Sequence, residues 1–268
     1  NYYNDFKREI MLPHKLSTLG PKTAVGDINS DGLEDFYIGG AKGSPGSLFI
    51  QKKSKKFIKS LQKTFELDQG SEDIDAHFFD ADGDGDQDLY VVSGGNEFKE
   101  TDILLQDRLY LNNGKGNFVK SSDQLPQIIS SGSCVKSADY DNDGDLDLFV
   151  GGRLIPNQYP YTPKSYLLQN DGKGHFIDVT SQKATQLEEV GMVTDAIWAD
   201  FNSDGLQDLI LVGEWMPITL FENKNGKLIN SSQDKGLDDS EGWWNSIASA
   251  DFDQDGDLDF IAGNFGLN

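Results

Sequence analysis

Acidic residues recur at a fixed spacing in five short segments of the chain. Each segment spans nine residues, and the five read DINSDGLED, DADGDGDQD, DYDNDGDLD, DFNSDGLQD and DFDQDGDLD. The shared pattern is Asp-x-Asp/Asn-x-Asp-Gly-x-x-Asp. Side-chain oxygens at positions 1, 3, 5 and 9, with the backbone carbonyl of position 7, can surround a hard cation that takes six to eight oxygen ligands. Such flexible, all-oxygen sites suit Ca²⁺ better than Zn²⁺, which prefers His or Cys, or Mg²⁺, which keeps its waters.

The spacing therefore predicts about five structural calcium sites. The side-chain ligands would be Asp27, Asn29, Asp31 and Asp35; Asp80, Asp82, Asp84 and Asp88; Asp139, Asp141, Asp143 and Asp147; Asp200, Asn202, Asp204 and Asp208; and Asp251, Asp253, Asp255 and Asp259. The carbonyl ligands would be Leu33, Asp86, Asp145, Leu206 and Asp257. Glycine at position 6 permits the positive φ of a sharp turn. Loops one and four carry Asn at position 3 and Leu at position 7, so we expect weaker sites there.

The acidic loops allow two other interpretations. An EF-hand loop starts in the same way, but it needs a glutamate at position 12 and a helix on each side. Position 12 falls here within β-rich sequence, which excludes the EF-hand. The second alternative is a set of solvated acidic turns without an ion. Five loops with one spacing disfavour it, and the mutual repulsion of up to five carboxylates within nine residues also favours a bound cation.

The net charge of the chain resides in the same segments. Of the 268 residues, 45 are acidic and 23 basic, and the five segments contain 22 of the acidic residues and no Lys or Arg. The chain lacks the basic stripe of a nucleic-acid-binding protein. No apolar run approaches the roughly 18 residues of a membrane span, and Cys134 alone cannot form an internal disulfide. Because the first residue is Asn, we expect a processed chain or an excerpt.

The acidic segments mark a repeat. They start at residues 27, 80, 139, 200 and 251, a mean spacing of 56 residues. A β-rich run follows each one, and in most repeats a second hairpin with an Asn/Gly/Lys turn comes next. Four antiparallel strands per repeat predict an all-β fold, a β-propeller of four-stranded antiparallel blades. A β-sandwich is disfavoured because it would not require one identical acidic turn in every four strands.

We expect one propeller domain over 1–268, with repeats at about 21–70, 71–130, 131–190, 191–240 and 241–268, the last incomplete. Residues 1–23 are predicted to supply an outer strand around Asp5 to Ile10. Either this strand closes a ring of five blades, or the chain is part of a larger propeller of about seven. The second arrangement is favoured because only nine residues follow the last acidic loop.

The face opposite the acidic loops is the candidate binding surface. Strand direction alternates, so the loops between second and third strands share that face, and aromatic residues gather there beside polar ones. Exposed aromatics next to Asn, Glu and Arg are typical of carbohydrate or protein contacts. The candidate partner-binding residues are Arg153, Tyr159, Tyr161, Trp215 and Trp243. Packing between blades is the alternative role for the tryptophans.

The five loops and YIGGAKGSPGSLFI (residues 37–50) resemble the FG-GAP or VCBS-type repeat, the blade unit of integrin α-subunit propellers. The stretches LPHKLSTLGP, GEWMPITLFEN and GWWNSIASADFDQDGDLDFIAGNFGLN are similar to parts of large bacterial outer-surface repeat proteins, some with an ASPIC/UnbV-type module. This resemblance implies a calcium-stabilised propeller that is displayed outside the cell, usually within a longer chain.

We therefore expect a non-enzymatic, secreted or surface-exposed module for protein or carbohydrate recognition or scaffolding. His14, His77 and His175 are far apart in the repeat, and no catalytic motif is found. A polysaccharide lyase or hydrolase on a propeller scaffold is the rival, with Arg153, Glu97 and Glu214 as its candidate residues. An accessory subunit of an outer-membrane protein complex is a third interpretation.

Overall fold

The computed structural model describes residues 3–266, and these residues form mainly antiparallel β-sheets. The first sheet contains β1 (Thr23–Gly26), β2 (Asp35–Ile38), β3 (Ser47–Gln51) and β4 (Phe57–Ser60). The second contains β5 (Asp73–Phe79), β6 (Asp88–Ser93), β7 (Arg108–Leu111) and β8 (Val119–Lys120). The third contains β9 (Ser131–Ala138), β10 (Asp147–Leu154), β11 (Tyr166–Gln169) and β12 (Ile177–Asp178). The fourth contains β13 (Met192–Ala199), β14 (Asp208–Met216), β15 (Thr219–Asn223) and β16 (Leu228–Asn230).

A last hairpin consists of β17 (Gly242–Ala250) and β18 (Asp259–Asn264). It joins the fourth sheet through β14, where Glu214 pairs with Trp243 and Met216 with Gly242. The helices are short: α1 (Lys63–Leu67), α2 (Thr180–Lys183) and 3₁₀ turns at Asp5–Lys7, Ile103–Leu105, Thr185–Glu189 and Gln233–Lys235. Within residues 3–266 there is no helix with the length and apolar character that crossing a membrane requires.

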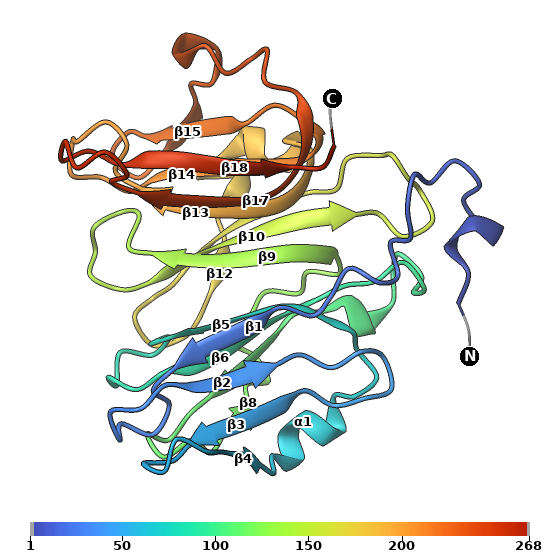
Figure 1. Cartoon of the computed structure of the whole chain (residues 1–268), viewed down its shortest axis with the longest axis vertical. Helices are drawn as coiled ribbons and strands as arrows, with labels where there is room; N and C mark the ends of the chain where they lie inside the picture. Colours follow the sequence, from blue (N-terminus) through green and yellow to red (C-terminus); the bar gives the residue numbers. More distant parts are fainter. Residues whose placement is uncertain (1–2, 267–268) are drawn as a thin grey trace.

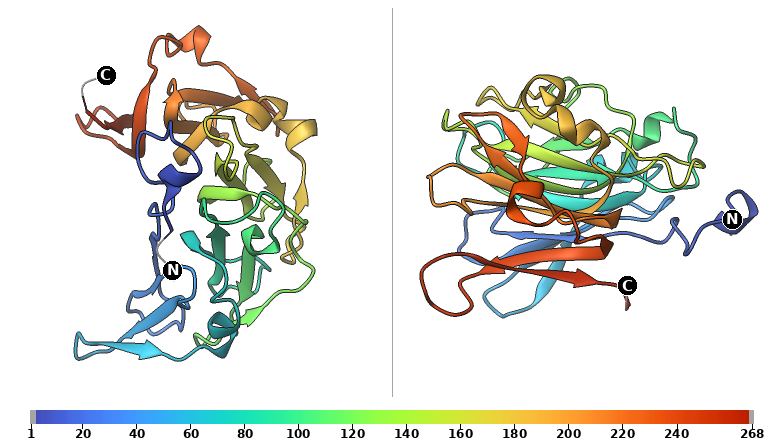
Figure 2. Two further views of the ribbon diagram at one scale, coloured as in Figure 1. Left: turned by 90° about the vertical axis from the view of Figure 1, so that its right-hand side faces the viewer. Right: turned by 90° about the horizontal axis from the view of Figure 1, so that it is seen from above.

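The sheets are the blades of a propeller. They follow one another around an arc, with the first sheet at one end and the β17–β18 hairpin at the other (Figure 2). The first strands of successive blades, β1, β5, β9, β13 and β17, pack against one another. In each of the four sheets, strands pair antiparallel in chain order. The predicted all-β propeller of four-stranded antiparallel blades is confirmed.

The hydrophobic core lies between the faces of adjacent blades. Tyr37 and Leu48 of the first blade pack with Leu89 and Tyr110 of the second, and a separate cluster fills each of the next two interfaces. Side chains along a strand alternate between its two faces. In β10, every residue is buried because blades cover both faces. The interior blades are thus held by packing on both sides.

The two ends of the arc differ from its interior. In β2, Asp35 and Tyr37 are buried whereas Ile38 on the other face is exposed. Val25 of β1 is 57% exposed, and Ile261 of β18 at the opposite end is also 57% exposed. The alternating strand pattern therefore leaves an apolar face uncovered at each end.

The prediction of an outer strand at the N-terminus was wrong. Residues Asp5–Lys7 form a 3₁₀ turn, and the N-terminal segment (residues 3–20) runs along the concave side of the arc (Figure 2). The Asp5 carboxylate is buried, and it accepts hydrogen bonds from the backbone N and Oγ of Ser17 at 3.0 and 2.6 Å. Because these contacts close the segment on itself, it cannot extend into a strand.

Candidate metal loops and ligand pocket

The five acidic segments connect the first and second strand of each blade. They lie between β1 and β2, β5 and β6, β9 and β10, β13 and β14, and β17 and β18. In Figure 1 all five turns gather at the left-hand edge of the molecule, and the N-terminal segment lies at the right-hand edge. The five acidic loops therefore lie on one face of the molecule, as the alternating strand direction predicts.

Internal hydrogen bonds fold every acidic loop in the same way. The position-1 carboxylate accepts a hydrogen bond from the N–H of the position-6 glycine in all five, as between Asp27 and Gly32 at 2.8 Å. The position-5 carboxylate accepts one from the N–H of position 7 in all five, as between Asp31 and Leu33 at 3.0 Å. The loops are therefore five copies of one local structure.

The position-6 glycines are required for their backbone conformation. Their φ angles lie between +82° and +99°. A Cβ added at any of them would meet no atom within 4 Å, so space does not select glycine here. The left-handed backbone conformation is what selects glycine, because residues with a Cβ disfavour it.

The position-9 aspartate is the first residue of the second strand, and a backbone N–H at the end of the third strand holds its side chain in place. Asp35, Asp88, Asp147 and Asp208 are buried, and Oδ1 of each accepts a hydrogen bond from a backbone N–H at the end of the third strand, at 2.6–2.8 Å. Burial, followed by repulsion from neighbouring acidic residues, raises the pKa of Asp147 to about 8 and that of Asp88 to about 7. A cation in the loop would oppose both effects.

These residues fit a bound Ca²⁺. The Oδ2 atoms of the buried Asp147 and Asp208 have no hydrogen-bond partner among the described residues. In three loops, three carboxylate oxygens lie within 4.8 Å of one another; these are the groups Asp80, Asp82, Asp88; Asp139, Asp141, Asp147; and Asp251, Asp253, Asp255. An orphaned buried carboxylate oxygen beside two others is a ligand set for a hard cation.

In loop one, the position-3 residue is an amide. Asn29 Nδ2 donates a hydrogen bond to Asp35 Oδ2 at 2.9 Å. Rotation of the amide by 180° presents Oδ1 at the same place, which is the orientation that an ion would select. The neutral amide removes one negative charge from the loop without removing an oxygen.

Asparagines at the ends of three third strands link loops two, three and four each to the acidic loop of the preceding blade, a feature that sequence reasoning missed. Nδ2 of Asn170 donates to the carbonyl oxygens of Ala81 in loop two and Leu146 in loop three, at 2.9 and 3.1 Å. The same two bonds recur at Asn112, to Ile28 and Gln87, and at Asn223, to Tyr140 and Gln207. The signal in the sequence is an Asn at one position of three successive hairpins, where the turn pattern alone already accounts for it.

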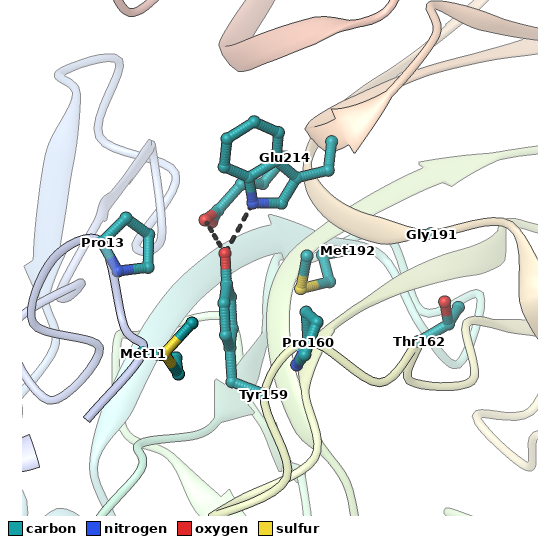
Figure 3. Close-up of a pocket in the computed structure, with 9 residues that line it drawn as sticks. Met11, Pro13, Tyr159, Pro160, Thr162, Gly191, Met192 and Glu214 are labelled. Atoms are coloured by element: carbon teal, nitrogen blue, oxygen red, sulfur yellow. Dashed lines mark hydrogen bonds between the residues drawn. The ribbon is translucent and has the colours of Figure 1, made fainter. Parts of the chain in front are cut away.

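At the other end of the strands lies a pocket of about 590 Å³, here called the Tyr159 pocket. Its lining residues are Met11, Pro13, Tyr159, Pro160, Thr162, Gly191, Met192, Glu214 and Trp215. Figure 3 shows the Tyr159 side chain rising through the pocket with its hydroxyl directed at Glu214. The walls are mainly apolar, and they come from the N-terminal segment, the loop after β10 and the two strands β13 and β14.

A buried ion pair forms the base of the Tyr159 pocket. Arg153 of β10 donates from Nη2 to Oε2 of Glu214, and both side chains are buried. The hydroxyl of Tyr159 donates to Glu214 Oε1 at 3.1 Å. Burial and the Glu214 charge outweigh the indole hydrogen bond and raise the pKa of Tyr159 to about 12. The base of the pocket is therefore neutral overall, and Arg153 lies beneath the surface that a ligand would touch.

Trp215 holds an exposed indole over this pocket. Its φ is +59°, an uncommon value for a bulky residue, and the residue is 59% exposed. Its Nε1 donates to the Tyr159 hydroxyl oxygen at 2.5 Å. The Trp243 ring lies 5.1 Å from that of Trp215 and 5.1 Å from that of His14. Strained conformations of this kind concentrate at ligand sites.

The remaining residues of this face are distributed as follows. Tyr161 is 69% exposed in the same loop as Tyr159. Glu97, which the enzyme alternative grouped with Arg153 and Glu214, is placed beside Glu72 instead. Burial, a hydrogen bond that the protonated Glu72 carboxyl donates to Glu97, and the negative charge of Glu97 raise the pKa of Glu72 to about 8. The ion pair is thus formed, but its third candidate has a different partner.

The N-terminal segment fixes the loop that carries Tyr159. Glu9 Oε1 accepts a hydrogen bond from the Tyr159 backbone N at 2.7 Å, and Oε2 accepts one from Asn96 Nδ2 at 2.7 Å. Arg8 donates to Asn157 Oδ1 at 3.0 Å. One segment therefore ties the face loops of the second and third blades and contributes Met11 and Pro13 to the pocket.

Comparison with known families agrees with this architecture. The model of the FG-GAP-like repeat matches residues 27–91, 80–150 and 200–262, more than half of the chain. The chain belongs to the FG-GAP-like repeat family. Each matched range starts at position 1 of one acidic loop and ends in the strand that follows the next acidic loop. These strands are β6, β10 and β18. No curated protein gives a significant match to this FG-GAP chain.

Solved structures resemble the FG-GAP chain in fold. A lectin from Agrocybe aegerita, described as recognising non-reducing terminal N-acetylglucosamine, is 18% identical with a TM-score of 0.52; the match covers 90% of this chain and 60% of the lectin. The Vibrio cholerae biofilm matrix protein Bap1 is 16% identical with a TM-score of 0.42, over 90% of this chain and 34% of Bap1. The Dos1 propeller is 9% identical with a TM-score of 0.44, over 85% of this chain and 61% of that one. The chain thus spans less than two thirds of each.

Proposed function

We propose that this FG-GAP propeller is a calcium-stabilised recognition module that acts outside the cell and binds a glycan in the Tyr159 pocket. The observation that carries the proposal is that the acidic loops and the pocket lie at opposite ends of the strands. One edge of the blades holds five identically folded acidic loops, and the other edge holds a pocket with an exposed indole. The ion sites thereby support the scaffold without occupying the binding face.

Calcium would be structural in this module. When bound, the ion supplies a divalent positive charge that the loop carboxylates coordinate, linking the first strand to the second. Asp147 and Asp208 would use their unpartnered Oδ2 atoms, and the side chains at positions 1, 3 and 5 would complete the set. Extracellular modules bind Ca²⁺ with Kd values of about 10⁻⁴–10⁻³ M, which suits the millimolar calcium outside cells and not a resting cytosol.

A neutral sugar ring fits the chemistry of the pocket. The Arg153–Glu214 pair leaves the base without net charge, so the site has no feature that selects a charged ligand. The indole of Trp215 and the ring of Tyr159 offer apolar faces with polar edges, which match the C–H face and the hydroxyl groups of a sugar. A volume of about 590 Å³ is within the range of small-ligand sites. The fold is shared with an N-acetylglucosamine-recognising lectin, which supports a glycan as the first class to test.

The test is a binding screen with neutral monosaccharides and short glycans, N-acetylglucosamine first, in millimolar CaCl₂. Titration calorimetry would then compare the wild-type protein with Trp215→Ala. The matched control is Phe57→Ala, an exposed aromatic of the first blade that is 45% exposed. Loss of glycan binding in Trp215→Ala alone supports the proposal. Glycan binding that survives Trp215→Ala, or a pocket that takes a peptide and no glycan, would overturn the assignment.

A further inference from the structure

We propose that neighbouring acidic loops bind calcium cooperatively and that Asn112, Asn170 and Asn223 transmit the coupling from blade to blade. The inference rests on the calcium binding proposed above. It concerns how the sites act on one another, which the identity of the ion does not determine. The coupling residues lie outside the nine-residue loops, in the third strands and the turns that follow them.

Each asparagine contacts the metal-binding segment of two loops. Ala81 is position 2 of loop two, between the candidate ligands at positions 1 and 3. Leu146 is position 8 of loop three, between the candidate ligands at positions 7 and 9. The single Nδ2 atom of Asn170 donates to both carbonyl oxygens, at 2.9 and 3.1 Å. A shift in either segment therefore changes a hydrogen bond of the other.

The same residue also holds a candidate ligand directly. The backbone N–H of Asn170 donates to Oδ1 of Asp147, the position-9 aspartate of loop three, at 2.8 Å. Its Oδ1 accepts a hydrogen bond from the N–H of Asp171 at 2.9 Å, which fixes the side chain on the turn. Asn170 thus joins loop two, loop three and the start of β10 through one rigid amide.

The three asparagines together connect the first four acidic loops in series. Asn112 joins loops one and two, Asn170 joins loops two and three, and Asn223 joins loops three and four. In the first blade the equivalent position is Gln51, whose backbone N–H also donates to the position-9 aspartate, Asp35, at 2.7 Å. The described residues contain no blade before it, so Gln51 serves as an internal control.

Burial makes the link energetically significant. Asn170 is 5% exposed and Asn223 is 1% exposed, so an amide that loses its carbonyl partner cannot turn to water. An ion that orders loop two fixes the Ala81 carbonyl, which holds the Asn170 amide in the position that loop three needs. The coupling is reciprocal, since loop three must then favour ion binding in loop two by the same factor.

The experiment is a calcium titration of the full chain after complete chelation, followed by calorimetry and by intrinsic tryptophan fluorescence. The wild-type protein is expected to bind with a Hill coefficient above 1. Asn170→Ala removes the link between loops two and three, which leaves loops one and two as one linked pair and loops three and four as another. The Hill coefficient should therefore fall, and the mean affinity for calcium should decrease about fivefold. Gln51→Ala should leave both values unchanged. Unfolding in EDTA, by circular dichroism, establishes that each variant is folded before titration.

The possible outcomes separate the two proposals. A wild-type chain that binds no calcium overturns the calcium proposal itself. A chain that binds calcium at independent sites, or one in which Asn170→Ala titrates like the wild type, overturns the coupling and leaves calcium binding standing. If Asn170→Ala does not fold, Asn112→Ala takes its place, because Asn112 is only half-buried and its loss is better tolerated.

Discussion

Asp208 and Glu214 lie near opposite ends of one strand and belong to different sites. Asp208 is the first residue of β14 and closes the fourth acidic loop, whereas Glu214, six residues later, is the acidic partner of Arg153 in the Tyr159 pocket. Both are fully buried. Six residues of strand separate them by about 20 Å. One continuous strand, β14, therefore joins a candidate ion site to the candidate binding face.

This connection predicts that calcium strengthens ligand binding. Without the ion, repulsion within loop four loosens the start of β14, and the position of Glu214 becomes less defined. We expect the affinity of the pocket for its glycan to fall about fivefold or more on chelation. Titration calorimetry in EDTA and in CaCl₂, with magnesium at the same ionic strength as control, measures the effect. Equal affinities in the two conditions would show that the sites are independent.

The buried ion pair makes a second prediction, on stability. Arg153→Ala leaves the Glu214 carboxylate buried and unpaired, and we expect it to lower the free energy of unfolding by about 3–5 kcal/mol. The double variant Arg153→Met/Glu214→Leu removes both charges and should recover most of that loss. Urea unfolding in CaCl₂ measures all three proteins. A double variant as unstable as Arg153→Ala would mean that the pair, rather than the orphaned charge, supplies the stability.

A third prediction concerns the unpartnered carboxylate of Asp147, whose replacement should act with opposite signs in the two calcium states. Asp147→Asn removes a carboxyl group whose ionised form is opposed by burial and by the charges of Asp141 and Asp145, so the chelated protein should melt at a higher temperature than wild type. In CaCl₂ the variant lacks one ligand and should melt at a lower temperature. Loss of a site held at ten times its Kd corresponds to about 1.4 kcal/mol. Differential scanning calorimetry measures both states.

The control for that substitution is Asp238→Asn, an exposed aspartate outside the loops. It should change neither melting temperature by more than a small fraction of the Asp147→Asn effect. If Asp147→Asn shifts the melting temperature in the same direction with and without calcium, the carboxylate is not an ion ligand.

A fourth prediction is a pH dependence caused by His77 of β5. Burial, with the nearby charge of Lys136, lowers the pKa of its imidazole from 6.5 to about 4. The unfolded chain therefore binds a proton between pH 6.5 and 4 that the folded chain does not bind. Stability from this residue is lost as the pH falls through that window, on the order of 3 kcal/mol in full.

The measurement is urea unfolding at pH 7 and pH 4.5 for the wild type and for His77→Gln, at one calcium concentration. Loop carboxylates titrate in both proteins, so the difference between them isolates His77. The difference should change by a few kcal/mol between the two pH values. A constant difference for His77→Gln would contradict the assignment.

How far the sequence predicts this molecule depends on the range of the interactions. The acidic loops were predictable because their folding hydrogen bonds, such as that of Asp27 with Gly32, lie within nine residues. The blades were predictable because strand alternation and turn residues are local signals too. The propeller fold followed from the repetition of both.

Long-range contacts account for what the sequence did not predict. Asn112 contacts Ile28 across 84 residues, and Arg153 contacts Glu214 across 61. Nothing in the local pattern distinguishes Asn112 from an ordinary turn residue. The strand expected in the N-terminal segment is wrong for the same reason, because the hydrogen bond from Asn96 to Asp5 spans 91 residues and forms only in the folded protein.

The most direct test of the calcium account is thermal unfolding of the exhaustively chelated chain with and without millimolar CaCl₂, combined with native mass spectrometry to count the ions. The account predicts a large, saturable rise in melting temperature and about five bound Ca²⁺, one for each acidic loop. An unchanged melting temperature with no bound ion would contradict it, and the acidic loops would then be solvated turns.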